Sequence, residues 1–211
     1  MVFLDPASGA IGPSPSSAPS AFTPSVRWGV AVEADDFRLS PTASSPSFSF
    51  HRLGPRSPLL AGYWQLRSAI FCEEQHLFES SDRDALDASA HPIVALHHGF
   101  EAADAGAVVG VVRIVETEPG VWYGGRLGVH RAFRRQNQIG KGLIWKAVTT
   151  AHGWGATRFL ATVQRQNVAF FRRLHWRSLE TLTIRGIDHH RMEADLTYYQ
   201  PGGERQRALV A

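Results

Sequence analysis

The segment most informative about the fold is Arg134-Arg135-Gln136-Asn137-Gln138-Ile139-Gly140-Lys141-Gly142-Leu143-Ile144. It follows a strand-like run, Val121–Val129, and it opens a strongly amphipathic helical pattern. At such a junction the unpaired N–H groups of the first helical turn and the positive end of the helix dipole meet. We therefore expect an anion-binding turn here, in which the preceding arginines and Lys141 add positive charge.

Two common phosphate-binding motifs do not fit this turn. A nucleotide-triphosphate loop requires a glycine five residues before Gly140 and a Ser or Thr after Lys141, but the chain has Arg135 and Gly142 at those positions. A dinucleotide-binding turn requires three glycines in a fixed spacing, and that spacing is absent. The anion that binds here is therefore expected to be of another class.

The turn resembles the coenzyme A loop of the GNAT N-acetyltransferases, whose pattern is Arg or Gln, two residues, Gly, any residue, then Gly or Ala. Arg135 stands at the first position and Gly140 at the last, while Gln138 replaces the first glycine. This departure suggests a bulkier turn that keeps its backbone donors. An ordinary basic turn at a helix start is the alternative interpretation of the segment taken alone.

A second segment, residues 166–176, strengthens the resemblance. GNAT enzymes carry an Asn-x-x-Ala-x-x-Tyr-x-x-x-Gly-Phe-like pattern here, and Asn167 and Trp176 match it. Phe171 stands where many relatives have a tyrosine that protonates the departing thiolate, and His175 replaces the usual glycine. The resemblance covers roughly residues 48–199.

Hydrophobic periodicity predicts an α+β fold. The order of the predicted elements resembles that of the GNAT family. Alternating and β-branched runs indicate strands, and apolar residues at helical spacing indicate helices. The expected strands are 47–50, 92–98, 107–115, 121–129, 158–163, 179–184 and 191–198, and the expected helices are 58–71, 139–151 and a short one within 166–176. The resemblance implies a mixed, mostly antiparallel sheet with helices on both faces.

The resemblance also implies a set of coenzyme contacts, with acetyl-CoA as the acyl donor. Gly128 would let the coenzyme approach the backbone closely, and backbone N–H groups of its strand would polarise the thioester carbonyl. The expected contacts are Leu127, Gly128 and Val129 along the pantetheine arm, Arg134, Arg135, Gln136, Asn137, Gln138, Ile139, Gly140, Lys141 and Gly142 around the pyrophosphate, and Asn167 and Phe171 at the thiol end.

Four residues are candidates for proton transfer during catalysis. The amine acceptor must be neutral to attack, so a base or a water chain must take its proton. Tyr123 stands five residues before Gly128, where histone-acetylating relatives place a glutamate, and is expected to position water or the acceptor. Glu116 and Glu74 are the candidate carboxylates, and His175 is a candidate acid, each with an ordinary surface or packing role as the alternative.

A narrower resemblance comes from the first predicted helix. Arg67, Phe71, Glu74 and Gln75 form an Arg-x-x-x-Phe-x-x-Glu-Gln pattern, and aspartates follow it at 82–87. This looks like the nitrogen-starvation N-acetyltransferases encoded beside nitrilase genes. It implies a role in nitrogen metabolism but no particular acceptor.

Composition narrows the class of ligand and the compartment. The net charge of +3 is modest, and basic residues cluster at 131–141 and 172–177, which suits a small polyanion better than a nucleic-acid duplex. No apolar run approaches the roughly 20 residues that span a membrane. The lone Cys72 excludes an internal disulfide, so a cytoplasmic location is expected. No metal site is expected, because adjacent histidines at 97–98 and 189–190 point to opposite faces of a strand.

Three segments are expected along the chain: a low-complexity, disordered arm at 1–46, an N-acetyltransferase domain at 47–199 and a flexible tail at 200–211. The leading interpretation is acetyl transfer from acetyl-CoA to a small amine, whose pocket is expected between loops 75–91 and 184–191. Acyl transfer from an acyl carrier protein, with a basic patch at 131–135, and a non-catalytic acyl-CoA sensor are the alternatives. The terminal strands could also pair in a homodimer.

Overall fold

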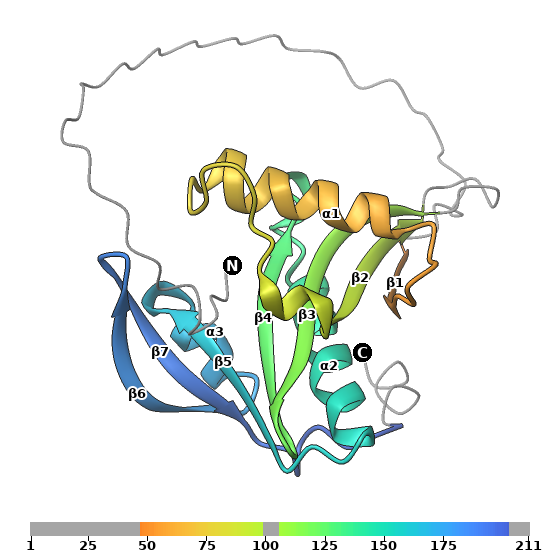
Figure 1. The fold of residues 1–211 in the computed structure, drawn as a ribbon. Coiled ribbons are helices and arrows are strands. Elements are labelled where there is room, and N and C mark those ends of the chain that lie inside the picture. The colour runs from red at the N-terminus through yellow and green to blue at the C-terminus, as the bar shows by residue number, and fades with distance from the viewer. Residues whose placement is uncertain (1–46, 99–105, 203–211) are drawn as a thin grey trace, which may run out of the picture. The chain divides into compact units, whose positions relative to one another are not determined.

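The computed structural model describes residues 47–98 and 106–202 (Figure 1). The predictions for residues 1–46 and 203–211 lie outside the described residues. The described chain forms a seven-stranded sheet in the order β1-β2-β3-β4-β5-β7-β6. Its strands are β1 Ser47–Arg52, β2 His91–His98, β3 Ala107–Glu118, β4 Val121–Val129, β5 Arg158–Gln164, β6 Trp176–Ile184 and β7 Ile187–Ala194.

Helices cover both faces of this sheet, as predicted. Helix α1, Leu60–Ser68, packs on one face, and helices α2, Asn137–Gly153, and α3, Val168–Arg172, pack on the other (Figure 1). The short helical segments are η1 Ala69–Glu74, η2 Ala85–Ala88, η3 Arg131–Phe133 and η4 Arg165–Asn167. None of the helices in the described part is long and apolar enough to cross a membrane.

The sheet divides where β4 leaves β5. These two strands pair in parallel from Val121 to Gly124 and from Arg158 to Ala161, whereas all the other strand pairs are antiparallel. Beyond Gly124 and Ala161 no pairing joins them, so the last residues of β4 leave one backbone edge outside the sheet. The gap between the ends of β4 and β5 is the feature around which the site is built.

The first predicted helix changes its geometry before it ends. The α-helix stops at Ser68 and continues as a π-helical turn, η1, in which Gln75 N–H donates to the carbonyl of Ile70 over 3.1 Å. Such wide turns are rare in proteins, and those that occur often lie at functional sites. This turn carries Glu74 and Gln75 to the mouth of the gap.

The last strand was predicted four residues too late. β7 begins at Ile187 because Arg185 and Gly186, with φ of +51° and +76°, form the tight turn after β6. It ends at Ala194 because Asp195 turns the chain back: its carboxylate accepts from the Thr197 N–H over 2.9 Å. Residues 195–198, predicted as strand, therefore form a turn.

Candidate active site

The exposed edge of β4 is the first element of the site. His130 N–H donates to the Val109 carbonyl of β3 over 2.8 Å. Since neighbouring residues on a strand direct their polar groups to opposite edges, Val129 faces the gap. Its carbonyl accepts from Arg134 Nε over 2.9 Å, which fits this direction.

The N-terminus of α2 is the second element. It begins at Asn137, and no side chain caps it from Gln136. Asn137, Gln138 and Lys141 are exposed there, whereas Ile139 and Gly140 are buried against the core. Ile139 N–H donates to the Gln136 carbonyl over 3.1 Å, so the N–H groups of Asn137 and Gln138 and about half a positive charge remain for an external partner. Asn137, Gln138 and Lys141, which were expected around the pyrophosphate, are therefore exposed in the first turns of α2.

Two glycines expected to serve the coenzyme are explained by packing. A Cβ on Gly128 would lie 2.8 Å from Ile70 Cδ1, so this glycine accommodates η1. A Cβ on Gly142 would lie 2.0 Å from Phe50 Cζ, so that glycine accommodates the ring of β1. Packing against η1 is therefore sufficient to account for a glycine at position 128. The side chains of Leu127 and Val129 also lie in the core between the sheet and α2.

Arg134 and Glu74 form an ion pair across the mouth of the gap. The guanidinium donates from Nη1 and Nη2 to the two carboxylate oxygens over 2.5 and 2.7 Å. Hydrogen bonds from Arg134 lower the pKa of Glu74, so the carboxylate stays ionised. Arg134, expected at the pyrophosphate, is thus already bound to a protein carboxylate, while Arg135 is exposed beside it.

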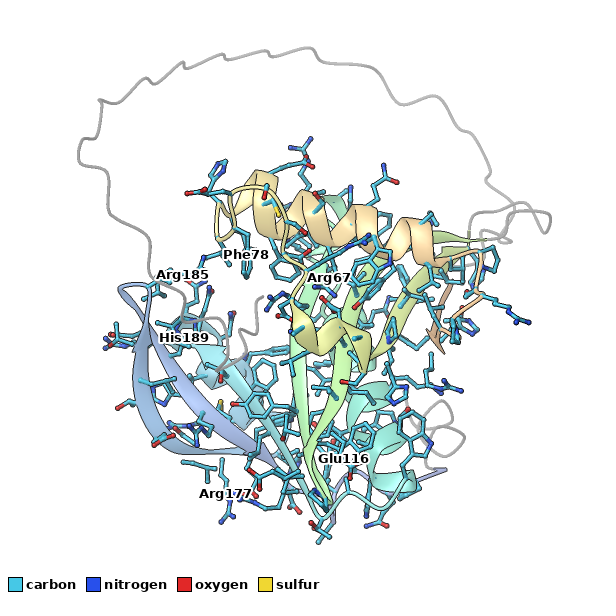
Figure 2. All side chains as sticks on the ribbon, in the orientation of Figure 1. Arg67, Phe78, Glu116, Arg177, Arg185 and His189 are labelled. Carbon is cyan, nitrogen blue, oxygen red and sulfur yellow. The ribbon has the colours of Figure 1, made fainter. Side chains whose placement is uncertain are left out.

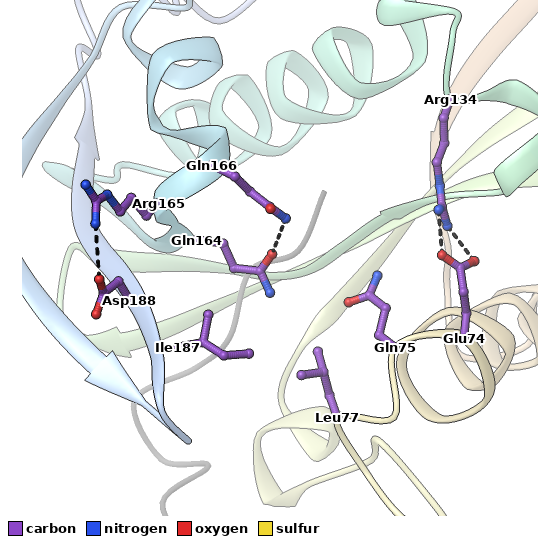
Figure 3. A pocket seen from close by; sticks show the side chains of 9 residues that line it. All are labelled: Glu74, Gln75, Leu77, Arg134, Gln164, Arg165, Gln166, Ile187 and Asp188. Atoms are coloured by element: carbon purple, nitrogen blue, oxygen red, sulfur yellow. Dashed lines mark hydrogen bonds and ion pairs between the residues drawn. The ribbon is translucent and has the colours of Figure 1, made fainter. Parts of the chain in front are cut away.

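A cleft of about 740 Å³ lies next to this ion pair (Figure 3). One wall comes from the end of η1 and the residues after it, and the other from the end of β5 and the start of β7. The lining residues are Glu74, Gln75, Leu77, Arg134, Gln164, Arg165, Gln166, Ile187 and Asp188. Both loops predicted to form the acceptor pocket contribute to it. Its charges occur as two pairs, because Arg165 also bonds Asp188, over 3.4 Å.

Tyr123 lies at the point where β4 and β5 diverge. Its hydroxyl and the hydroxyl of Thr162 are 2.8 Å apart, and both residues are buried. Tyr123 packs with Val115 and Leu160. The phenol is therefore enclosed at the base of the gap, and it does not line the open cleft.

Two candidate catalytic residues lie at the end of the sheet away from the cleft. Glu116 is exposed and accepts from the Gly120 N–H over 2.8 Å, which closes the β3–β4 turn. Figure 2 shows it at the opposite end from Arg185. His175 stacks on Tyr198 at 3.7 Å, and its carbonyl accepts from the N–H of Asp195, beyond the far end of β7. Neither side chain is among the residues that line the cleft, so the geometry gives no support to Glu116 and His175 as catalytic groups.

The helix after β5 also differs from expectation. Phe171 is fully buried, and its ring meets Trp176 edge-on at 5.3 Å, so it is part of the core. Asn167 lies at the junction of η4 and α3. Its Nδ2 is buried without a hydrogen-bond partner among the described residues. An orphaned amide donor of this kind suits a ligand carbonyl.

A buried charge cluster behind the cleft was not predicted. Arg67, Arg113 and Arg126 are fully buried, and they bond the aspartates of the segment before and within η2. Asp82, Asp84 and Asp87 are those aspartates, so three positive and three negative groups meet. A lone arginine inside the apolar run of β3 was the sequence signal for a buried cation. In the described ranges, no group of three His, Cys, Asp or Glu residues is placed to hold a metal ion.

Known proteins share this fold. A model of the acetyltransferase (GNAT) family matches residues 61–176. An acyl-CoA N-acyltransferase from Pseudomonas aeruginosa is 22% identical, with a TM-score of 0.58, and the match covers 72% of this chain and 100% of that one. ElaA from Escherichia coli is 21% identical with the same TM-score of 0.58, over 72% of this chain and 100% of that one. At these identities the structures share the fold. No curated protein matched the chain.

Proposed function

The chain belongs to the acetyltransferase (GNAT) family, and we propose that it moves an acetyl group from acetyl-CoA to the amine of a small molecule. The observation that carries this proposal is the gap between β4 and β5, which opens beside the uncapped N-terminus of α2. An exposed strand edge suits the amides of a pantetheine arm, and a helix N-terminus suits a diphosphate.

The residues at this junction support the fit to the coenzyme. Asn137, Gln138 and Lys141 would hold the diphosphate through the first turn of α2, and Arg135 would add a charge-assisted bond. The orphaned amide of Asn167 would donate to the pantetheine arm. Coenzyme A supplies an activated acetyl thioester, and the remaining chemistry falls to the protein and the acceptor.

Attack of the neutral amine forms one amide bond and breaks the thioester carbon–sulfur bond, so coenzyme A leaves as a thiolate while the amine nitrogen loses one proton, which the thiolate can take up through water. The N–H groups on the exposed edge of β4 would stabilise charge on the carbonyl oxygen. Glu74 is a weak base because Arg134 lowers its pKa, so we assign it to orienting the ammonium or a water rather than to taking its proton. Water in the open cleft would carry the proton away, and Tyr123 would position groups at the base of the gap.

The acceptor would occupy the cleft of about 740 Å³. Its charged groups occur as the pairs Glu74–Arg134 and Arg165–Asp188, which favours a polar amine of small net charge. The sequence pattern around Arg67 and Gln75 is the support for a role in nitrogen metabolism. A cytoplasmic location and a homodimer stay predictions.

A charge placed on the helix end tests the coenzyme site. The Gln138→Glu substitution keeps the side-chain shape, and a glutamate in the first turn favours the helix through its dipole. The same charge repels a diphosphate. We expect acetyl-CoA to bind the wild type with micromolar affinity by calorimetry, and the variant to bind roughly tenfold or more weakly, with unchanged or higher thermal stability.

The matched control is Gln65→Glu on the exposed side of α1, which adds the same charge away from the gap. It is expected to bind acetyl-CoA as the wild type does. Equal binding by wild type and Gln138→Glu would remove the diphosphate from α2. No binding by the wild type would reject acetyl-CoA as the donor, and an acyl carrier protein, for which the exposed Arg131 and Arg135 are suited, would be tested instead.

A further inference from the structure

Strained backbone gathers around the cleft. Among the described residues, His76, Arg126, Arg185 and His175 are the non-glycine residues with positive φ. His76 and Arg185, at +50° and +51°, lie on segments that border the cleft, Arg126, at +53°, lies on β4, and His175 lies at the far end of the sheet. Left-handed backbone is unfavourable for side chains with a Cβ. It persists where surrounding contacts hold it, and such positions are common at ligand clamps.

The turn between β6 and β7 has the geometry of a two-residue hairpin loop. Ile184 pairs with Ile187, and both central residues, Arg185 and Gly186, have positive φ. This turn type favours Asn or Asp before the glycine, because these residues tolerate the left-handed region. Arginine at this position departs from the preference, so its side chain is the feature to explain.

The Arg185 side chain reaches across to the opposite wall. Its Nη1 donates to the carbonyl of Leu77, and its guanidinium lies 4.9 Å from the ring centre of Phe78 (Figure 2). Leu77 lines one wall of the cleft and Ile187 the other (Figure 3). Arg185 therefore joins the two walls. We call Leu77, Phe78 and Arg185 the bridge.

The bridge is anchored to the strand that borders the gap. The guanidinium of Arg126, on β4, lies 4.6 Å from the ring centre of Phe78. Arg126 is fully buried and donates to the carbonyl of Asp82 over 2.9 Å and to the carboxylate of Asp84 over 2.9 Å. The buried charge cluster fixes the position of Arg126. Because Phe78 packs against Arg126, the bridge is also held in place.

From this geometry we infer that Arg185 is a specificity-determining residue, which closes one side of the acceptor cleft and restricts acceptors to small-molecule amines. The inference rests on the proposed acetyltransferase function. A lysine within a peptide carries its amine at the end of a side chain, and the backbone continues in both directions from the base of that side chain, at about 3.3 Å per residue. Such an acceptor requires free space on both sides of the cleft mouth, and the bridge would occupy one of those sides.

The remaining lining gives the chemistry of the acceptor. Gln75, Gln164 and Gln166 supply amide groups, and Gln166 Nε2 donates to Gln164 Oε1 over 3.0 Å. Leu77 and Ile187 supply apolar surface. A small amine with hydroxyl or amide groups and a short apolar part fits this combination, since side-chain amides both donate and accept hydrogen bonds.

The Arg185→Asn variant removes the bridge and is expected to leave the fold intact. Asparagine tolerates the left-handed conformation and is favoured before glycine in this turn, so the hairpin is kept while the guanidinium is lost. The control is Arg56→Asn, which removes the same charge from an exposed position between β1 and α1. Thermal unfolding should show both variants folded, with Arg185→Asn at least as stable as the wild type.

Acceptor choice is measured by thiol release from acetyl-CoA. The panel contains amino alcohols, polyamines and aromatic amines, together with a lysine-containing peptide and a peptide with an unblocked N-terminus. For wild type and Arg56→Asn we expect kcat/KM for the best small amine to exceed that for either peptide by about 100-fold or more. In Arg185→Asn that ratio should shrink by about tenfold or more.

Efficient acetylation of a peptide by the wild type, or an unchanged ratio in Arg185→Asn, would overturn the inference while acetyl-CoA binding still supported the proposed function.

Hydrogen exchange adds a readout that needs no acyl donor. Amides at 75–78 and 184–188 should exchange faster together in Arg185→Asn. If they exchange as in the wild type, no bridge constrains the loops and the inference fails for any donor. Absence of acetyl-CoA binding would instead reject the proposed function on which it rests.

Discussion

Arg134 holds the carboxylate of Glu74, 60 positions away in the chain, through two hydrogen bonds of 2.5 and 2.7 Å. The same guanidinium bonds the Val129 carbonyl at the exposed edge of β4 over 2.9 Å. Three elements therefore meet at one side chain: the end of η1, the end of β4 and the turn before α2. An anionic ligand at this turn must share Arg134 with Glu74.

Removing the charge of Glu74 is expected to strengthen coenzyme binding. Glu74→Gln leaves Arg134 without its anionic partner and takes a negative charge away from the diphosphate site. Exposed ion pairs contribute about 0–1 kcal/mol, so we expect acetyl-CoA affinity to rise roughly two- to fivefold and the free energy of unfolding to change by less than about 1 kcal/mol. Calorimetry at low and high salt should show the gain shrink as salt screens it.

The adjacent Glu73→Gln is the control, because Glu73 is exposed and is not among the residues that line the cleft. It should leave acetyl-CoA affinity near the wild-type value. A tenfold loss of affinity in Glu74→Gln would mean that Glu74 itself supports the ligand, against the present argument.

Gly142 is expected to be required for packing. In Gly142→Ala the new Cβ would lie 2.0 Å from Phe50 Cζ. Alanine favours a helix by about 1 kcal/mol over glycine, but overpacking costs about 1–3 kcal/mol and here the contact is severe. Chemical denaturation should show a net loss of stability of roughly 1–2 kcal/mol.

The partner substitution tests this explanation. Phe50→Leu makes room for the alanine, so the loss caused by Gly142→Ala should be smaller in the Phe50→Leu background. Folded Gly142→Ala protein should still bind acetyl-CoA. Loss of binding at full stability would show instead that Gly142 serves the coenzyme.

Local signals made part of the fold predictable from sequence. β4 was predicted with its observed bounds because the Pro119-Gly120 turn precedes it and a basic turn follows it. The start of α2 was also predictable from a local signal, since its apolar residues and its basic residues are contiguous in the sequence. The predicted bounds of β7 were wrong because this strand is polar and because it ends at the Asp195 turn. The β-forming residues that continue beyond Ala194 hide this end in the sequence.

The site was less predictable because it depends on pairing between distant segments. Glu116 and His175 look suitable as isolated residues, but the sheet register places both at the end away from the gap. The ion pair of Glu74 with Arg134 and the bonds of Arg67 to Asp82 join residues 60 and 15 positions apart. Periodicity carries no information on such contacts.

Tyr123→Phe tests whether the phenol takes part in catalysis. Its hydroxyl is buried against the Thr162 hydroxyl at 2.8 Å. Removing it should cost about 0.5–1.5 kcal/mol of stability through the lost hydrogen bond. We expect kcat to fall by less than about tenfold, because general acid–base groups contribute about a hundredfold or more. Steady-state kinetics with thermal unfolding separate the two effects, and Thr162→Val should reproduce the stability loss. A fall in kcat of a hundredfold with little loss of stability would give Tyr123 a direct chemical role.

The buried charge cluster predicts that the protein loses stability in acid. Burial alone raises the pKa of Asp84 and Asp87, but hydrogen bonds from Arg113 to Asp84 and from Arg67 to Asp87, together with the nearby arginine charges, outweigh it and hold both pKa values below the ordinary 3.8. A carboxyl whose folded pKa is depressed stabilises the fold above its unfolded pKa, and that stability disappears as pH falls through the folded value. The free energy of unfolding should therefore be flat above about pH 5 and fall steeply below about pH 4.

Asp87→Asn isolates this effect. Asp87 bonds Arg67 over 2.6 Å and Arg113 over 2.7 Å, and both arginines are fully buried. Arg67 keeps Asp82 and Arg113 keeps Asp84, but the buried cluster then holds three cations and only two anions. Removing one member of a buried ion pair costs about 3–5 kcal/mol, so the variant should be destabilised by up to about that amount at pH 7 and should lose less on acidification than the wild type. Asp188→Asn, with a side chain that is 60% exposed, should change stability by less than about 1 kcal/mol. If denaturation at pH 7 and pH 3 gave Asp87→Asn the same acid loss as the wild type, the acid sensitivity would have to come from other carboxylates.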